Sequence, residues 1–360
     1  AFGVLIWHYQ HFFFRGVWQP EIGSVLRHGL PLYRPLILFY EYGNRAVPFF
    51  WVISGYIFYW HYAESVRTGA VSFGTYWLRR FSRLYPLHLA TLIIVATAQY
   101  FYWRSHGVNF IYGSNTKGEF LAQLLFASNW LVGSPPSFNG PIWSVSIEVL
   151  IYMCFFGVAR AFGSRALPAA IAAAGFVVGF AILRRVLDPQ VFYCGIYFFA
   201  GGVAQRLTSS KLALPVAGGA AIVTGAAAAL GHLPPAAAIL GRPLNDLSVL
   251  ILATSLVIVM TKLGESTLRA LFHRLAFLGN ATYSSYLIHF PLQLLTVIVI
   301  DRIGISRTVF FSPLALLTYL GVVVGSGLLV HRYFEMPAQD AIRRAMKSFV
   351  SPKPLLRQPA

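Results

Sequence analysis

Two histidines near the start of the chain lie where a proton could be transferred. His8 and His11 fall in an apolar run, residues 1–18, long enough to cross a bilayer. Ionisable side chains are costly in hydrocarbon, so they mark functional sites by default. The neutral imidazole of His8 can accept a proton from a hydroxyl near physiological pH; helix packing is the competing interpretation. His11 would share its helix face, but no third ligand has suitable spacing, so we predict no metal site.

A second polar group opens the apolar run 142–159. Pro141 suits the first turn of a helix, after which Ser144, Glu148 and Tyr152 recur every four residues on one face. Glu148 would lie about 10 Å into that helix, at a rise of about 1.5 Å per residue. A carboxylate at this depth needs a partner, which would be either part of a reaction centre or a structural ion pair with an arginine.

Three arginines precede the apolar run 84–103. Arg79, Arg80 and Arg83 have the i, i+3 and i, i+4 spacings that place side chains on one helix face. Guanidinium groups bind phosphate through two parallel hydrogen bonds, so the cluster could hold a phosphorylated ligand. Anchoring at the cytoplasmic membrane surface explains the same residues and is the alternative.

Two further groups lie near the end of the chain. His289 is a second histidine within an apolar run, 275–300, and it follows several hydroxyl side chains, among them Tyr286. Pro291 is expected to kink this helix locally. Glu335 ends the last apolar run, where pairing with an interfacial arginine is the favoured interpretation.

The composition predicts an all-α integral membrane protein. Of 360 residues 57% are hydrophobic and 11% charged, whereas soluble domains carry about 25% charged residues. Apolar runs of membrane-spanning length predict a bundle of about ten transmembrane helices, and the shorter run 120–131 predicts a re-entrant or interfacial segment. The expected spans are 1–18, 47–62, 84–103, 142–159, 167–183, 191–205, 212–231, 247–261, 275–300 and 308–330.

The distribution of charge predicts the topology. The net charge of +17 comes from Lys and Arg in short loops, which favours contact with lipid head groups over nucleic acid. We therefore expect a multi-pass protein of the cell (inner) membrane. The positive-inside rule predicts that both of its termini are cytoplasmic. We expect one transmembrane domain over residues 1–347, with a first helix that starts upstream of residue 1, and a disordered tail over 348–360.

Taken in order, these segments resemble the membrane-bound acyltransferase family 3. That family has a histidine in its first helix, here His8, and a phenylalanine-rich Ser-Gly segment, here residues 47–56. Its later motifs are Arg-x-x-Arg with a following Tyr-Pro (Arg80, Arg83 and residues 85–86), Trp-Ser-x-Ser-x-Glu (Trp143, Ser144, Ser146 and Glu148), a Ser-Tyr-x-x-Tyr-Leu-x-His element with some drift (Ser285, Tyr286 and His289), and Glu-x-Pro (Glu335 and Pro337). The family's arginine upstream of the histidine would precede residue 1.

The resemblance implies O-acyl transfer from cytoplasmic acyl-CoA, with acetyl or another short acyl group, to a hydroxyl of a carbohydrate or lipid-linked acceptor. It implies no permanently bound cofactor. His8 would be the general base and Glu148 would orient it, as an acid does in hydrolytic triads. The expected donor-binding residues are Arg79, Arg80 and Arg83; the expected acceptor or supporting residues are His11, Trp143, Ser144, Ser146, Tyr286, His289 and Glu335.

A transporter is the main rival class. His8, Glu148 and His289 could form a proton relay in a proton-coupled secondary transporter, or serve a translocator of acyl groups. The predicted partners are acyl-CoA, the acceptor and membrane lipids, and the sequence does not indicate an oligomeric state.

Overall fold

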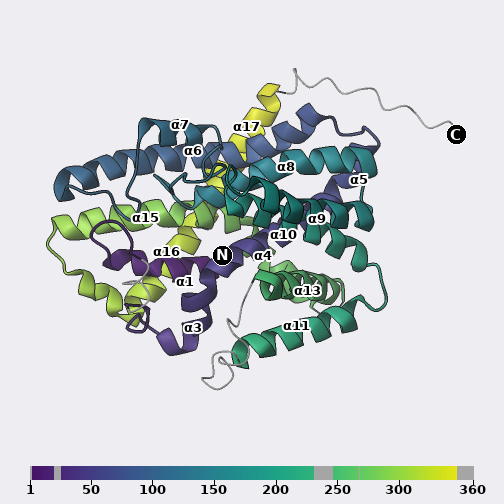
Figure 1. Ribbon diagram of the computed structural model, residues 1–360. Helices are drawn as coiled ribbons and strands as arrows, with labels where there is room; N and C mark the ends of the chain where they lie inside the picture. Colours follow the sequence, from purple (N-terminus) through teal and green to yellow (C-terminus); the bar gives the residue numbers. More distant parts are fainter. Residues whose placement is uncertain (1, 20–25, 231–245, 267, 347–360) are drawn as a thin grey trace.

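The computed structural model describes residues 2–19, 26–230, 246–266 and 268–346 (Figure 1). Within these ranges the chain is helical and contains no β-strand, which confirms the predicted all-α class. The helices are α1 (Phe2–His8), α3 (Tyr33–Tyr42), α4 (Ala46–His61), α5 (Ala63–Arg67), α6 (Phe73–His106), α7 (Lys117–Leu124), α8 (Ile142–Phe162), α9 (Ala166–Leu183), α10 (Pro189–Leu207), α11 (Ala213–Leu230), α13 (Asp246–Glu265), α14 (Arg269–Asn280), α15 (Thr282–Arg302), α16 (Pro313–Val330) and α17 (Met336–Met346). Short 3₁₀ turns η1 (Tyr9–Phe13), η2 (Gly43–Arg45) and η3 (Arg307–Phe311) and a π turn η4 (His331–Glu335) join them.

Six helical segments of the described chain are long and apolar enough to cross a membrane, so the predicted count of about ten is not confirmed. They are Phe73–His106, Ile142–Phe162, Ala166–Leu183, Asp246–Glu265, Thr282–Arg302 and Pro313–Met346. Within the expected span 1–18, α1 ends at His8 and the 3₁₀ turn η1 follows it. At Phe14 the backbone has already changed to the extended conformation. The expected span 275–300 is divided between α14 and α15.

The segment expected to be re-entrant, 120–131, begins as a short helix. A capping box between Thr116 and Glu119 starts α7, which ends at Leu124. The chain then continues as a loop in which Phe126 and Asn129 are buried and have positive φ. The predicted tail 348–360 lies outside the described residues.

Helix α6 is the long support of the structure. The Ser72 hydroxyl caps its start and Gly107, with φ of 72°, ends it. At about 1.5 Å per residue this helix is roughly 50 Å long, which exceeds the hydrocarbon thickness of about 30 Å. Arg79, Arg80 and Arg83 therefore lie inside a continuous helix that begins well before the expected span 84–103.

Two aromatic-rich cores meet along the bundle. The first joins α4, α8, α10 and the first half of α6; the second joins α1, α16 and the second half of α6. Helix α15 belongs to both, because Leu287 packs in the first core and Phe290 in the second. His289 lies between these two residues, so it occupies the boundary of the two cores.

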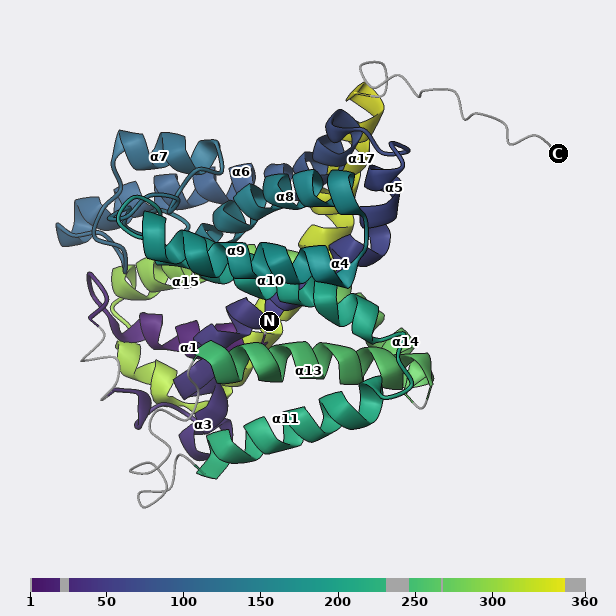
Figure 2. The ribbon, with the colours of Figure 1, turned by 45° about the vertical axis from the view of Figure 1, so that its right-hand side comes forward.

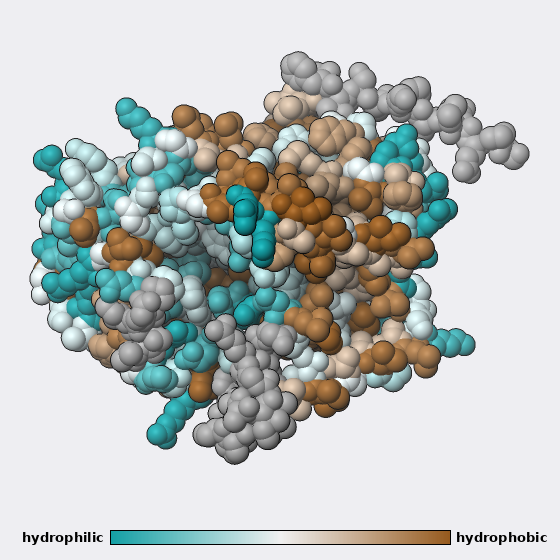
Figure 3. All heavy atoms as spheres, viewed as in Figure 1, coloured by the Kyte–Doolittle hydropathy of each residue, from teal (hydrophilic) through white to brown (hydrophobic). Residues whose placement is uncertain are grey.

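Apolar side chains also cover much of the outside. In Figure 3 they gather over α8, α9 and α10 as Figure 1 draws them, whereas hydrophilic side chains gather at the left edge. On α9 the side chains of Leu167, Ile171 and Ile182 are exposed. In Figures 1 and 2, α11 and α13 form a pair set off below α10. Such surfaces are stable when lipid covers them.

Helices α4 and α10 approach each other at glycines. A Cβ atom on Gly55 would lie 1.8 Å from the Phe198 carbonyl oxygen, and one on Gly201 would lie 2.1 Å from that of Val52. Small residues allow this close backbone approach. The close packing of α4 against α10 thus explains why the Ser-Gly segment has a glycine at position 55.

Gly55→Ala is expected to destabilise the protein by about 1–3 kcal/mol, because the added methyl group meets backbone that cannot rotate away. Gly157→Ala on α8 is the control, since a Cβ atom there has open space within 4 Å. Thermal unfolding in detergent measures both variants. Equal melting temperatures for Gly55→Ala and the wild type would contradict this account of the α4–α10 contact.

Candidate active site

Three histidine rings come together at the boundary of the two cores. His8 ends α1, His11 lies in η1 and His289 lies in α15. The His8 ring centroid is 4.8 Å from that of His11 and 4.8 Å from that of His289, whose ring stacks on it. The structure therefore joins two segments that are 281 positions apart in the sequence. We call these three residues the histidine cluster.

The cluster holds buried nitrogen atoms with no hydrogen-bond partner among the described residues. They are Nδ1 of His8, Nδ1 of His11 and Nε2 of His289. Nδ1 of His289 lies 2.5 Å from the Tyr286 carbonyl oxygen. Because a carbonyl oxygen only accepts, this Nδ1 carries the proton, and in the neutral ring Nε2 keeps a lone pair. Buried polar groups without partners are rare, so these nitrogens are suited to a ligand.

Of the three histidines, His8 is the one that is not fully buried. Its side chain is half-buried, whereas His11 and His289 are buried. The Gln293 amide donates to the His8 carbonyl oxygen at 2.9 Å and thereby ties the end of α1 to α15. Gly43 packs directly against the backbone of α1. A Cβ atom on Gly43 would lie 2.1 Å from the Gly3 carbonyl oxygen. The glycine at 43 thus fixes the position of α1.

The start of α8 is fastened to α15. Tyr286 OH donates to the Pro141 carbonyl oxygen at 2.8 Å, so the Ser144 hydroxyl, 2.8 Å away, donates to Tyr286. The Asn139 amide donates to the Leu287 carbonyl oxygen at 3.2 Å. Ser144 and Tyr286 therefore set the position of the helix turn that carries His289.

Glu148 lies within the electrostatic range of Tyr286 and is not part of the histidine cluster. Ser54 and Tyr152 interact with its carboxylate, and the positive charges of Arg80 and Arg83 attract it. Among the described residues no hydrogen bond or ion pair joins Glu148 to His8, whose electrostatic neighbours are His11 and His289. The predicted contact through which Glu148 would orient His8 is therefore not formed. The i, i+4 spacing gave the face of α8 correctly but not the neighbour that this face meets.

Arg80 is held between aromatic rings. Its guanidinium lies 4.8 Å from the ring centroid of Phe58 and 4.9 Å from that of Tyr62, and it donates to Tyr62 OH at 2.5 Å. Arg79 and Arg83 are exposed. Arg343 of α17 joins this group by donating to Ser82 at 3.3 Å, and it lies within the electrostatic range of Arg79 and Arg80. We call Arg79, Arg80, Arg83 and Arg343 the arginine cluster.

The remaining predicted residues have packing partners. The Ser146 hydroxyl lies 2.7 Å from the carbonyl oxygens of both Phe126 and Ser128, and so holds the loop after α7 against α8. Trp143 packs edge-on against Trp51. Both residues support the site and neither belongs to the histidine cluster.

Glu335 does not pair with an arginine as predicted. Its buried carboxylate accepts from Ser284 at 2.5 Å, and Nδ1 of His331 lies 3.2 Å away. The π turn η4 widens the helix and ends two residues before Pro337, which cannot donate a backbone hydrogen bond. This turn directs Glu335 inward to the first turn of α15.

Several polar residues of the interior were not predicted. His88 is fully buried on α6 and its Nε2 lies 2.7 Å from the Gln123 carbonyl oxygen. Its place within an apolar run was a usable signal, as was the position of Gln293 one helical turn after His289. The contribution of Arg343 carried no such signal, because it depends on the packing of α17 against α6.

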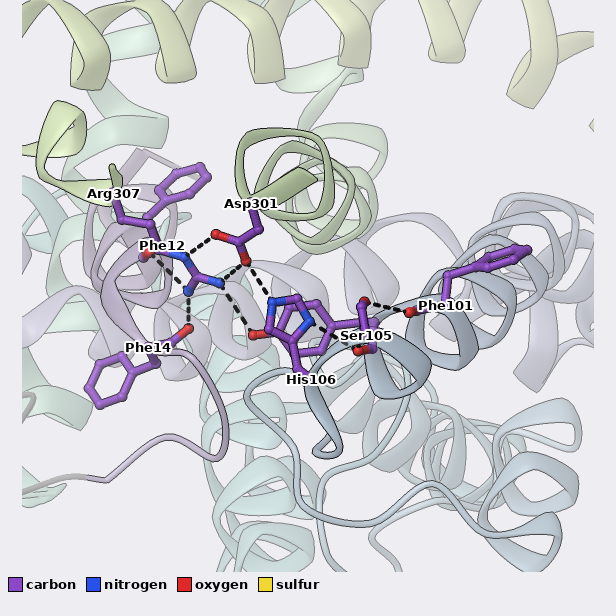
Figure 4. Close-up of polar contacts among 8 residues, drawn as sticks. Phe12, Phe14, Phe101, Ser105, His106, Asp301 and Arg307 are labelled. Carbon is purple, nitrogen blue, oxygen red and sulfur yellow. Dashed lines mark hydrogen bonds and ion pairs between the residues drawn. The ribbon is translucent and has the colours of Figure 1, made fainter. Parts of the chain in front are cut away.

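A buried ion pair lies at the end of the bundle near η1 (Figure 4). Arg307 pairs with Asp301 and donates to the Phe14 carbonyl oxygen, while His106 contacts Asp301 at 3.0 Å. Burial alone would lower the pKa of Arg307, but its hydrogen bonds to Asp301 and Tyr102 hold that pKa above the usual arginine value. The guanidinium is therefore charged and fixes the chain after the histidine cluster.

The described residues contain no group of three or more His, Cys, Asp or Glu side chains arranged to hold a metal ion. The chemistry that the histidine cluster itself offers is proton transfer. An imidazole lone pair in an enclosed site can accept a hydroxyl proton and return it within one reaction cycle.

Comparison with known proteins identifies the family. A family model described as an acyltransferase domain matches residues 1–331, which is most of the chain. Acyltransferase MdmB of Streptomyces mycarofaciens is 28% identical over 137 residues, or 38% of this chain, and the match spans 30% of that relative. No solved structure matches. The chain belongs to the membrane-bound acyltransferase family 3.

Proposed function

We propose that this membrane acyltransferase moves an acetyl or other short acyl group from acyl-CoA to a hydroxyl of a carbohydrate or lipid-linked acceptor. The observation that carries the proposal is the histidine cluster, which has buried nitrogens without a partner among the described residues and one half-buried member, His8. The arginine cluster supports the donor assignment, because it gathers positive charge suited to phosphates, and two of its members, Arg80 and Arg83, lie within the electrostatic range of Glu148.

These residues can carry out the proposed acyl transfer. His8 accepts the proton of the acceptor hydroxyl while the hydroxyl oxygen attacks the thioester carbonyl carbon. The carbon–sulfur bond then breaks, and the imidazolium returns its proton to the CoA thiolate. The products are an O-acyl ester and CoA-SH, and no other reactant is required. His289 and Tyr286 are positioning residues, since His289 packs against the His8 ring and Tyr286 accepts from Ser144.

Glu148 is assigned a positioning role toward the donor. It lies within the electrostatic range of Arg80, Arg83 and Tyr286, so it connects the arginine cluster to the residues around the histidine cluster. Glu148 keeps Arg80, the half-buried member of the cluster, directed toward the interior, where the thioester must reach the acceptor. The arginine cluster faces the cytoplasm of the cell (inner) membrane in the proposed orientation, and both termini do the same.

Arg80→Ala is expected to raise the KM for acyl-CoA by about 10–100-fold with a smaller change in kcat, because a charge-assisted contact of roughly 1.5–3 kcal/mol is lost from donor binding. Arg80→Lys should recover only part of the loss, since an ammonium group lacks the planar fork. Photolabelling of purified protein with a CoA probe measures donor binding directly.

Arg269→Ala is the matched control, because Arg269 is an exposed arginine of α14 outside the cluster. We expect it to label as the wild type does. Full labelling of Arg80→Ala, with the protein folded, would contradict the donor assignment. Labelling that is lost equally in both variants would show that general surface charge, and not the arginine cluster, attracts the probe.

A further inference from the structure

A groove lies between the second half of α6 and the second half of α15, away from the histidine cluster. Its volume is about 1030 Å³, at the upper end of the range for ligand pockets. The walls are largely apolar and include Ile93, Ile94, Phe101, Leu295 and Ile298. Ile93, Ile94 and Phe101 are exposed, so the groove opens toward the lipid-facing side of the bundle.

One end of the groove is polar and basic. Arg104 and Arg302 line it together with Ser105 and His106. Neither guanidinium group has a hydrogen bond or an ion pair within the described parts of the chain. Asp301, the acidic residue among the described residues that line the groove, is already engaged by Arg307 and His106. The groove therefore has an uncompensated positive end.

The basic end lies at membrane-surface depth. Arg80 and Arg104 are 24 positions apart on one helix, or roughly 36 Å at about 1.5 Å per residue, which is close to the bilayer thickness of about 30 Å. The two arginines of the groove thus lie at the membrane surface opposite the arginine cluster. The positive-inside rule disfavours arginines on that side in the proposed orientation, so a specific partner would explain them.

We propose that this groove binds an anionic membrane phospholipid, with its phosphate at Arg104 and Arg302 and an acyl chain along the apolar walls between α6 and α15. Apolar walls that end in unpaired guanidinium groups match the two parts of such a lipid. The network of Asp301, Arg307 and His106 gives the basic end a fixed wall (Figure 4). The bound lipid would hold together the ends of two helices that carry His88 and His289.

Native mass spectrometry of the purified full chain tests the proposal, with phosphatidylglycerol and phosphatidylcholine as probes. The wild type should retain phosphatidylglycerol preferentially. Arg104→Gln or Arg302→Gln should weaken its binding roughly fivefold, and the double variant about 30-fold, since each basic side chain contributes on the order of a fivefold preference near an anionic surface. Arg34→Gln, at an exposed arginine outside the groove, should bind as the wild type does.

A second variant tests the apolar walls without changing charge. Thr97→Trp would fill the groove and should displace phosphatidylglycerol, whereas Thr97→Ser should leave binding unchanged. Wild-type melting temperatures would show that these surface variants are folded. The proposal is overturned if the double arginine variant binds phosphatidylglycerol as tightly as the wild type, if phosphatidylcholine binds equally well, or if Thr97→Trp retains the lipid.

Discussion

His8→Ala is expected to lower kcat for acyl transfer by about 10²–10⁴-fold, the usual contribution of a general base. The KM for acyl-CoA should change little, because the arginine cluster is intact. Among the three residues of the histidine cluster, His8 is the one that is not fully buried, and a base must reach the acceptor hydroxyl. Release of CoA-SH in membranes that contain the variant measures the rate.

His273→Ala is the control for this experiment, because His273 is exposed on α14 and lies outside the cluster. It should turn over at the wild-type rate. His289→Gln distinguishes the general base from a positioning residue. We expect kcat to fall less in His289→Gln than in His8→Ala. Near-normal turnover in folded His8→Ala would refute the assignment of the base, even if donor binding and the family membership stand.

Asp301→Asn is expected to destabilise the protein by about 3–5 kcal/mol, since it leaves the Arg307 guanidinium buried without a counter-charge. The side chain of Arg307 is 6% exposed and that of Asp301 16%. The same Arg307 holds the Phe14 carbonyl oxygen, so the variant should also loosen the chain beside the histidine cluster. Thermal and denaturant unfolding in detergent measure the stability change.

The pair of Arg45 and Asp246 supplies a matched comparison. It joins the same two residue types at 2.6 Å, but its side chains are 36% and 49% exposed. Solvent-exposed ion pairs contribute about 0–1 kcal/mol, so Asp246→Asn should change stability within that range. Equal losses in Asp301→Asn and Asp246→Asn would show that burial does not set the importance of the Arg307 pair.

The sequence predicted the helical class and the order of the motifs, because run length and local spacing are properties of neighbouring residues. The start of α8 illustrates this: Pro141 and the four-residue spacing of Ser144 and Glu148 placed both side chains on one helix face, as the structure has them. The break after His8 was not predicted, since the apolar run 1–18 continues through the 3₁₀ turn η1. Hydropathy does not distinguish a straight span from an interrupted one.

Contacts between distant segments could not be predicted. His8 and His289 meet because Gln293 and Gly43 fix α1 against its neighbours, and no local pattern encodes that contact. The same holds for Arg343, which reaches Ser82 across 261 positions. The expected pairing of His8 with Glu148 is not formed for this reason: His8 meets His11 and His289, whereas Glu148 meets Ser54 and Tyr152.

The most direct test of the central claim follows an isotope-labelled acetyl group. Membranes that contain the protein would be incubated with labelled acetyl-CoA, and glycans and lipids would then be analysed by mass spectrometry. We expect label in base-labile O-acetyl esters of the acceptor, with one CoA-SH released per ester, and loss of this label in His8→Ala. Vesicles that accumulate an unmodified solute, with no labelled ester formed in the wild type, would contradict it and favour a transporter.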